Sequence, residues 1–140
     1  MTAPEPRRRA PLVRYADETE AMACPYGVVR RIVTGGEGGV ANVHVVSVEQ
    51  GDPHAHQGYD EVYWVVSGQG YIELDGRTFE LRTGTVAVIP AGTVHSVRAT
   101  RGQQLEFVIL GIPPVPITDD RARPMRSGAG GCQPGESRAV

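Results

Sequence analysis

The stretch "PHAHQGYDEVYWVVSG", Pro53–Gly68, brings two of the four histidines of the chain close to an acidic residue. Side chains alternate between faces along a strand, so His54 and His56 point the same way and could hold one ion between two imidazoles. Glu61 stands at an odd spacing from His56, which a straight strand would place on the opposite face. A turn permitted by Gly58 can bring the chain back, so that Glu61 begins the next strand facing inward.

A fourth candidate ligand, His95, lies in "PAGTVHSV", residues 90–97. Pro90 and Gly92 favour a tight turn that delivers this imidazole from a separate strand. Three imidazoles and one carboxylate form a mixed nitrogen and oxygen shell that suits a divalent transition metal. A metal that prefers six ligands would keep two adjacent positions open for water, dioxygen or substrate oxygens. The predicted metal ligands are therefore His54, His56, Glu61 and His95.

The rest of the chain has the composition of many short strands joined by turns. Eighteen glycines and eleven prolines lie between short runs rich in Val, Ile and Thr, and no convincing helix separates these runs. The "DG" pair at Asp75 and Gly76 is a strong hairpin signal. The pattern predicts an all-β antiparallel sandwich or barrel, with strand-like runs at 28–34, 41–48, 54–56, 61–67, 71–74, 78–82, 85–89, 95–99 and 105–110.

Both ends of the chain differ in composition from this central part. Residues 1–24 contain three prolines that discourage helix entry, and only "DETEAMA", 17–23, could form a short helical turn. Residues 114–140 are rich in Pro, Gly and charge, which is typical of a segment that cannot bury enough surface to order itself. We therefore predict an N-terminal arm (1–24), one barrel domain (25–113) and a flexible C-terminal tail (114–140).

Composition excludes several classes of function. All fourteen basic residues are Arg, so mechanisms that need a Schiff-base, phosphate-loop or nucleophilic lysine are excluded. The net charge of −2 without a broad basic patch argues against a nucleic-acid partner. No apolar run is long enough to span a bilayer or to form a signal peptide. Cys24 and Cys132 lie too far apart for a redox or zinc pair, and we interpret both as free thiols. We expect a cytoplasmic protein with no membrane partner.

Two motifs of the chain resemble those of the cupin superfamily. The first pattern is G(X)5HXH(X)3–4E(X)6G, and His54–Gly68 match it from the HXH to the last glycine. The second pattern is G(X)5PXG(X)2H(X)3N, and residues 84–99, which include His95, match it up to the last position. There are two departures: only two residues separate Gly51 from His54, and Ala99 replaces the final Asn. Neither departure changes a ligand position.

The resemblance covers about residues 28–112 and implies a double-stranded β-helix, or jelly-roll, barrel. It also implies a metal at the mouth of the barrel and commonly a homodimer formed by strand exchange or edge packing. In such an arrangement Trp64 would anchor a contact between sheets or between subunits.

A metal with open positions in an apolar barrel predicts an enzyme acting on a small oxygen-bearing organic substrate. The favoured activity is a non-haem Fe(II) oxygenase, because the carboxylate beside three histidines resembles the iron-dependent members, the cupin dioxygenases. The alternative uses Zn, Ni, Mn or Cu as a Lewis acid in a polyketide cyclase, isomerase or lyase. A composition typical of a high-GC genome slightly favours a role in secondary metabolism. A small-molecule-binding cupin without catalysis is the third alternative.

Tyr63 and Glu61 are the predicted catalytic residues. Strand alternation places the Tyr63 phenol on the same face as Glu61, and a tyrosine close to a divalent cation can act as a general base. The alternative is that Tyr63 forms an aromatic wall of the barrel. We interpret His44, in "NVHVV", as a hydrogen-bonded core or surface residue.

Overall fold

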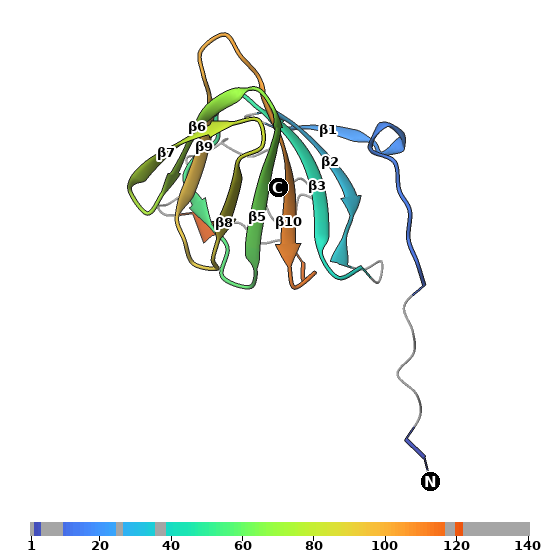
Figure 1. Ribbon diagram of the computed structural model, residues 1–140. Helices are drawn as coiled ribbons and strands as arrows, with labels where there is room; N and C mark the ends of the chain where they lie inside the picture. The colour runs from blue at the N-terminus through green and yellow to red at the C-terminus, as the bar shows by residue number, and fades with distance from the viewer. Residues whose placement is uncertain (1, 4–9, 25–26, 36–38, 117–119, 122–140) are drawn as a thin grey trace.

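The protein is built from two antiparallel β-sheets that face each other, as the computed structural model shows (Figure 1). The structure describes residues 2–3, 10–24, 27–35, 39–116 and 120–121. The six-stranded sheet has the order β1-β2-β3-β10-β5-β8. Its strands are β1 (Ala21–Cys24), β2 (Gly27–Val33), β3 (Asn42–Val48), β10 (Leu105–Ile112), β5 (Asp60–Ser67) and β8 (Val86–Ile89).

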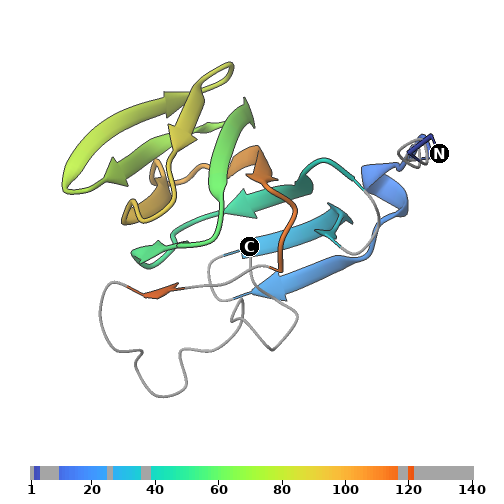
Figure 2. The ribbon, with the colours of Figure 1, turned by 90° about the horizontal axis from the view of Figure 1, so that it is seen from below.

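The five-stranded sheet has the order β11-β4-β9-β6-β7. Its strands are β11 (Asp120–Arg121), β4 (His54–Ala55), β9 (His95–Ala99), β6 (Gln69–Leu74) and β7 (Arg77–Arg82). Seen from below, β6, β7 and β9 lie on one side of the molecule and β1, β2 and β3 on the other (Figure 2). This arrangement confirms the predicted all-β jelly-roll fold.

Alternation along the central strands separates the inside of the barrel from its outside. In β3 every second residue, beginning with Asn42, is buried, and β10 shows the same pattern from Leu105. A strand turns successive side chains to opposite faces, so these buried positions all line the space between the sheets. The hydrophobic core lies there, and its members include Val46, Val65 and Phe107.

The inner face of the six-stranded sheet changes from apolar to polar toward one end of the barrel. In the pairing of β3, β10 and β5, Val46, Phe107 and Val65 form one row of the inner face. The next row holds His44, Ile109 and Tyr63, and the last holds Asn42, Gly111 and Glu61. The apolar rows therefore form a floor, and the chemically active side chains gather at one mouth of the barrel.

The hairpin predicted at Asp75 and Gly76 is confirmed. These two residues connect β6 to β7 and have φ angles of 47° and 84°. Two successive positive φ angles are typical of the type I′ turn, whose twist matches that of a two-stranded antiparallel hairpin.

The N-terminal arm differs from the prediction in its last residues. A 3₁₀ turn lies at Ala16–Glu18, and β1 then pairs with β2 instead of continuing a helical turn. The Arg30 guanidinium donates a hydrogen bond to Ala16 O over 3.1 Å, which ties the turn to the sheet. Residues 10–15, ahead of this turn, run away from the barrel (Figure 1).

Part of the predicted C-terminal tail pairs with the barrel. Asp120 and Arg121, as β11, pair with Ala55 and His54 of β4. Residues 117–119 and 122–140, including Cys132, lie outside the described residues. Among the described residues no helix has the length and apolar character needed to cross a membrane.

Candidate metal centre

The four predicted metal ligands meet at the polar mouth of the barrel. His54 lies in β4, His56 directly follows that strand, Glu61 lies in β5 and His95 begins β9. One ligand atom from each residue lies within 4.8 Å of those of the others. Because β4 and β9 belong to one sheet and β5 to the other, the cluster bridges the two sheets.

Backbone pairing explains why residues far apart in the sequence meet here. His54 and His95 are direct cross-strand partners in β4 and β9. The turn ahead of β9 is held in place because Gly92 N donates to His56 O over 2.7 Å. Asp60 Oδ1 also accepts a hydrogen bond from Ala91 N over 2.8 Å. The same contacts therefore hold the turn that precedes His95 and the segment from His56 to Asp60.

Backbone carbonyls orient two of the imidazoles. His54 Nδ1 lies 3.0 Å from Asp52 O, and His95 Nδ1 lies 2.9 Å from Thr93 O. A carbonyl oxygen can only accept, so each Nδ1 carries the proton and each Nε2 keeps its lone pair. Such a contact behind a histidine ligand is the usual way in which proteins present Nε2 to a metal.

The third imidazole, His56, is oriented by a tyrosine that the sequence analysis did not select. The Tyr59 hydroxyl lies 2.8 Å from His56 Nδ1, and the two rings stack with centroids 4.8 Å apart. In front of the imidazoles, Glu61 Oε1 lies 3.3 Å from His56 Nε2 and 3.2 Å from His95 Nε2. Tyr59 could have been suspected only from its position just after the two histidines.

Burial and neighbouring charges set the ionisation of the cluster. Burial, together with the neighbouring imidazoles of His95 and His56, lowers the pKa of His54 to about 3. Burial alone would raise the pKa of Glu61, but the imidazoles of His56 and His95 beside its carboxylate lower it to about 2. At neutral pH His54 is therefore neutral and Glu61 is ionised, which are the forms that bind metals.

The donor set fits a divalent transition metal. Metal–ligand bonds of about 2.1 Å place neighbouring donors of one ion about 3.0–3.4 Å apart, and the distances of 3.2 and 3.3 Å to Glu61 Oε1 fall in that range. Imidazole nitrogens with one carboxylate suit Zn, Fe, Ni and Cu. These four residues could therefore hold one ion, and the donor set does not select among the metals.

Tyr63 lies beside the cluster, on the same face as Glu61. Its hydroxyl is 3.4 Å from Glu61 Oε1. The ring stacks on Phe107 with centroids 4.8 Å apart and meets the edge of His95 at 5.9 Å. Tyr63 thus both forms part of the aromatic wall and directs its hydroxyl toward Glu61.

His44 is buried, as expected of a core residue, but the predicted hydrogen bond is wrong. Its two ring nitrogens have no hydrogen-bond partner among the described residues. The burial of His44 could be predicted from the alternating pattern of "NVHVV", because this pattern places His44 on the same face as its buried neighbours Asn42 and Val46.

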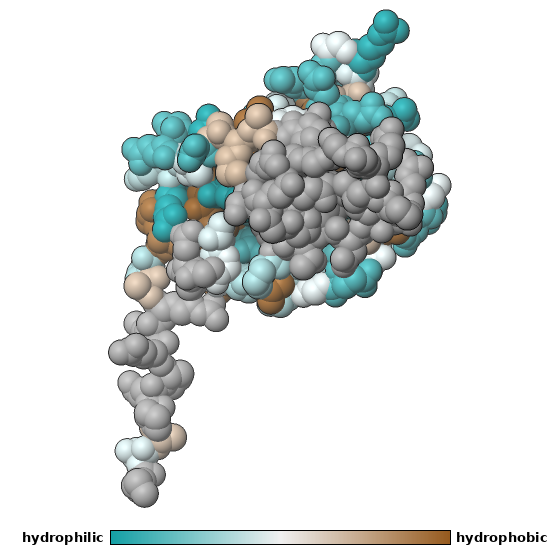
Figure 3. Space-filling model, turned by 180° about the vertical axis from the view of Figure 1, so that it is seen from behind, coloured by the Kyte–Doolittle hydropathy of each residue, from teal (hydrophilic) through white to brown (hydrophobic). Residues whose placement is uncertain are grey.

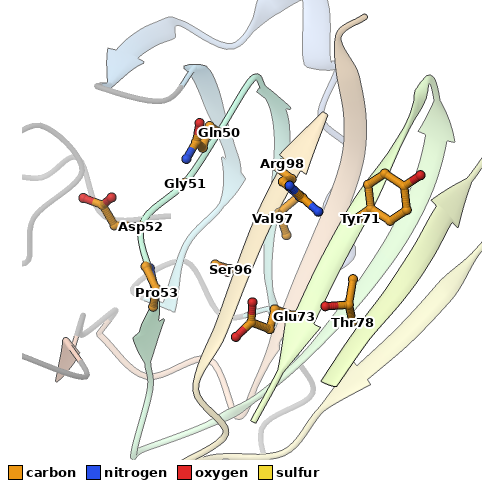
Figure 4. A pocket seen from close by; sticks show the side chains of 10 residues that line it. All are labelled: Gln50, Gly51, Asp52, Pro53, Tyr71, Glu73, Thr78, Ser96, Val97 and Arg98. Carbon is orange, nitrogen blue, oxygen red and sulfur yellow. The ribbon is translucent and has the colours of Figure 1, made fainter. Parts of the chain in front are cut away.

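A groove lies on the outer surface of the five-stranded sheet, and Figure 4 shows its lining residues. Ser96 and Arg98 line it, and strand alternation turns them away from His95, their inward-facing neighbour. The Arg98 guanidinium lies over the Tyr71 ring, 5.1 Å from its centroid. The groove and the histidine cluster are therefore on opposite faces of one sheet.

Comparisons with known proteins agree with this architecture. The model of the family described as "Cupin domain" matches residues 41–111. An oxalate-binding protein of Thermotoga maritima is 31% identical over 55 residues, which are 39% of this chain and 46% of that protein. The chain spans about half the length of the curated relatives it matches first.

Two solved structures share the fold. A predicted oxalate decarboxylase from Thermotoga maritima has a TM-score of 0.65 at 19% identity, with 73% of this chain and 99% of that chain covered. The polyketide cyclase RemF from Streptomyces resistomycificus has a TM-score of 0.68 at 18% identity, with 82% and 87% covered. At these identities the likeness concerns the fold alone.

Proposed function

Since the chain belongs to the cupin family, whose model matches residues 41–111, we propose that it is a metal-dependent enzyme acting on a small oxygen-bearing organic molecule. The observation that carries the proposal is the convergence of three buried imidazoles and one carboxylate within 4.8 Å. If these groups were buried together without a cation, their polar atoms would lose their hydration and gain few favourable contacts.

The activity that the site supports best is a non-redox proton transfer, as in a cyclase, isomerase or lyase. A divalent ion bound by the four donors would supply Lewis acidity toward a substrate oxygen. Tyr63 would move the proton at its phenolic oxygen, which lies 3.4 Å from Glu61 Oε1. Glu61 would complete the donor set and fix the direction of that phenol. Phe107 and Ile109, both buried, would keep water away from the floor of the site.

A metal analysis tests the first part of this proposal. Protein purified without added metal, or loaded with Zn²⁺ and desalted, should hold about one ion per chain by elemental analysis. Glu61→Gln should lower the metal affinity about 10- to 100-fold, because it removes the anionic donor. Glu73→Gln is the matched control, since Glu73 is exposed on the other sheet. Equal metal affinity in both variants would exclude Glu61 as a ligand.

A second experiment tests catalysis. The zinc form should convert a member of a panel of small enolisable carbonyl compounds, with exchange of a carbon-bound proton for deuterium followed by NMR. Ligand binding without turnover by any metal form would instead identify a binding protein. In that case Glu61→Ala would weaken ligand affinity but would remove no reaction.

The second candidate is a non-haem Fe(II) oxygenase, favoured by the three-histidine, one-carboxylate donor set, which suits iron as well as zinc. Protein purified anaerobically and loaded with Fe(II) should then consume dioxygen when its substrate is supplied, as measured with an oxygen electrode. Turnover by the zinc form without oxygen uptake by the iron form would exclude this candidate.

A further inference from the structure

His44 lies inside the barrel with polar atoms that the described protein groups do not satisfy. It is 2% exposed, and neither ring nitrogen has a hydrogen-bond partner among the described residues. Buried polar groups nearly always have a partner, because an unsatisfied one loses its bonds to water without replacement. The ring nitrogens of His44 therefore lack a partner among the described residues, and a bound ligand could provide one.

Arg31 lies directly beside His44 on the neighbouring strand. The two residues are opposite each other in the pairing of β2 with β3, and directly opposed residues project their side chains to the same face. Val29, two positions earlier on β2, is fully buried, and Arg31 shares its face. Arg31 Nε is itself buried. An arginine thus points into the barrel next to the unsatisfied imidazole.

The electrostatic environment of His44 connects this pair to the candidate metal centre. Burial and, to a smaller extent, the charge of Arg31 lower the pKa of His44 to about 4, against an opposing effect of Glu61. The imidazole is therefore neutral at neutral pH, and it offers one donor and one acceptor. It also lies within electrostatic range of both the guanidinium and the carboxylate of the metal cluster.

Asn42 extends the polar surface toward the mouth. It precedes His44 by two positions on β3 and shares its inner face. Its amide nitrogen donates to Val115 O over 2.9 Å, while its oxygen is buried without a hydrogen-bond partner among the described residues. Two side chains with unsatisfied polar atoms on one inner strand face are unlike an apolar core and resemble the lining of a ligand site.

We propose that Arg31 and His44 form a subsite inside the barrel that binds a carboxylate group of the substrate. The inference rests on the proposed function in one respect: a second oxygen of the same substrate would face the four candidate metal donors. Asn42 lies beside the subsite and positions the ligand. The substrate class is therefore a small carboxylate that carries a second oxygen function.

The chemistry of the two side chains favours a carboxylate over a neutral group. A guanidinium offers paired donors that match the two oxygens of a carboxylate, and a neutral imidazole adds one further donor. A divalent ion together with the single Glu61 carboxylate would leave a net charge of +1 at the metal site. An anionic ligand would neutralise that charge, whereas a neutral ligand would not.

The test compares two ligands that differ by one charge, succinate and its monoamide succinamate. Titration calorimetry on the zinc-loaded protein should show that succinate binds about tenfold more tightly, the lower range for a charged hydrogen bond in a buried site. Arg31→Gln should remove this preference. Arg98→Gln is the matched control, since Arg98 lines the groove on the outer face of the other sheet, and this variant should keep the preference.

Two His44 variants test the imidazole. His44→Leu should weaken succinate binding about tenfold, and His44→Gln, which keeps a donor, should recover part of the loss. Metal content and the thermal midpoint, measured for every variant, separate a lost subsite from a lost fold. Loss of binding in His44→Leu without a fall in either quantity is the expected result.

Three results would overturn the inference: no measurable binding of succinate to the wild-type protein, a preference that survives in Arg31→Gln, or a preference lost in Arg98→Gln. The last would place the anion in the outer groove. Failure of the proposed function is distinguished by elemental analysis, because the protein would then contain no bound metal. The same pair of ligands on the metal-free protein would then still report the charge preference at Arg31.

Discussion

Glu61 shows how single residues of this site combine opposing physical effects. It is 2% exposed and yet ionised, because two imidazoles that contact Oε1 outweigh the effect of burial on its pKa. The opposite holds for His54, which burial keeps neutral. The carboxylate and this imidazole are therefore held in their metal-binding forms before any ion arrives.

Acid should destabilise the metal-free protein by a few kcal/mol. The pKa of His54 is about 3 when folded against 6.5 when unfolded, and that of Glu61 is about 2 against 4.5. In both cases the unfolded chain binds protons first, so stability is present above the unfolded pKa and falls with decreasing pH. Urea unfolding at pH values from about 7.5 down to about 3 should show a decline that begins near pH 6.5 for His54 and steepens below pH 4.5 for Glu61. In Glu61→Gln the second part should be missing.

Replacing His44 should stabilise the fold while it weakens ligand binding. His44→Leu removes two buried nitrogens that have no described partner and keeps a similar side-chain volume. The expected gain in the free energy of unfolding is roughly 1–2 kcal/mol, measured with urea at pH 7. A loss of that size would instead show that the imidazole contributes to stability.

The Tyr63 hydroxyl should matter for the reaction and little for the fold. Tyr63→Phe keeps the stacking on Phe107 and removes only the oxygen beside Glu61. With the substrate found by the proton-exchange panel, kcat should fall about 10²- to 10⁴-fold, the usual contribution of a general acid or base. KM and metal content should change little. Unchanged kcat would leave Tyr63 as a wall residue only.

At the scale of the strands and turns, the glycines of the two motifs have separable roles. Gly68, which ends the first motif, has a φ of 89°, and a Cβ added there would lie 2.0 Å from Gln104 O. Gly84, which begins the second motif, has a φ of 88° with nothing within 4 Å of such a Cβ. The first position thus needs glycine for conformation and for close approach, and the second for conformation alone.

Alanine at these two glycines should therefore have unequal effects. Gly84→Ala should lower the free energy of unfolding by about 1 kcal/mol, the lower range for a side chain at positive φ. Gly68→Ala should lower it by about 3 kcal/mol or more, since overlap with the backbone of Gln104 adds to the strain. Urea unfolding of both variants measures the difference. Equal losses would show that the backbone near Gln104 yields without cost.

On the scale of the whole molecule, the outer face of the six-stranded sheet is apolar near its β8 edge. Trp64, Val86 and Val88 are 54%, 58% and 63% exposed. Trp64 pairs with Val86, and Val62 with Val88, so these side chains form one continuous patch. On the back of the molecule the coloured residues are mixed, with hydrophilic residues beside smaller hydrophobic patches (Figure 3). An exposed apolar patch beside an open strand edge favours association.

We propose that this patch, Val62, Trp64, Val86 and Val88, contacts a second copy of the chain in a homodimer. Trp64→Glu should shift the mass in solution from dimer to monomer, as measured by light scattering after size exclusion. Tyr71→Glu on the outer face of the other sheet is the control and should remain dimeric. Trp64 is the single tryptophan, so its emission should move to longer wavelength as the wild-type protein is diluted. A monomeric wild type would exclude the dimer.

Some features follow from the amino-acid sequence alone because they depend on local rules. Alternation along each strand places Asn42, His44 and Val46 on one face, and the two motifs contain the four candidate metal donors. The hairpin at residues 75–76 follows from the need of its two residues for positive φ. These features can be predicted from each short stretch of sequence, without knowing which strands lie beside it.

Only the tertiary structure decided which strands lie side by side. The pairing of His44 with Arg31 and of β11 with β4 joins segments whose relative position is set by the closed barrel. Register between distant strands results from packing of the whole core, which no short stretch of sequence encodes. For that reason the candidate metal donors could be predicted from the sequence, whereas the proposed subsite at Arg31 and His44 depends on the pairing of β2 with β3.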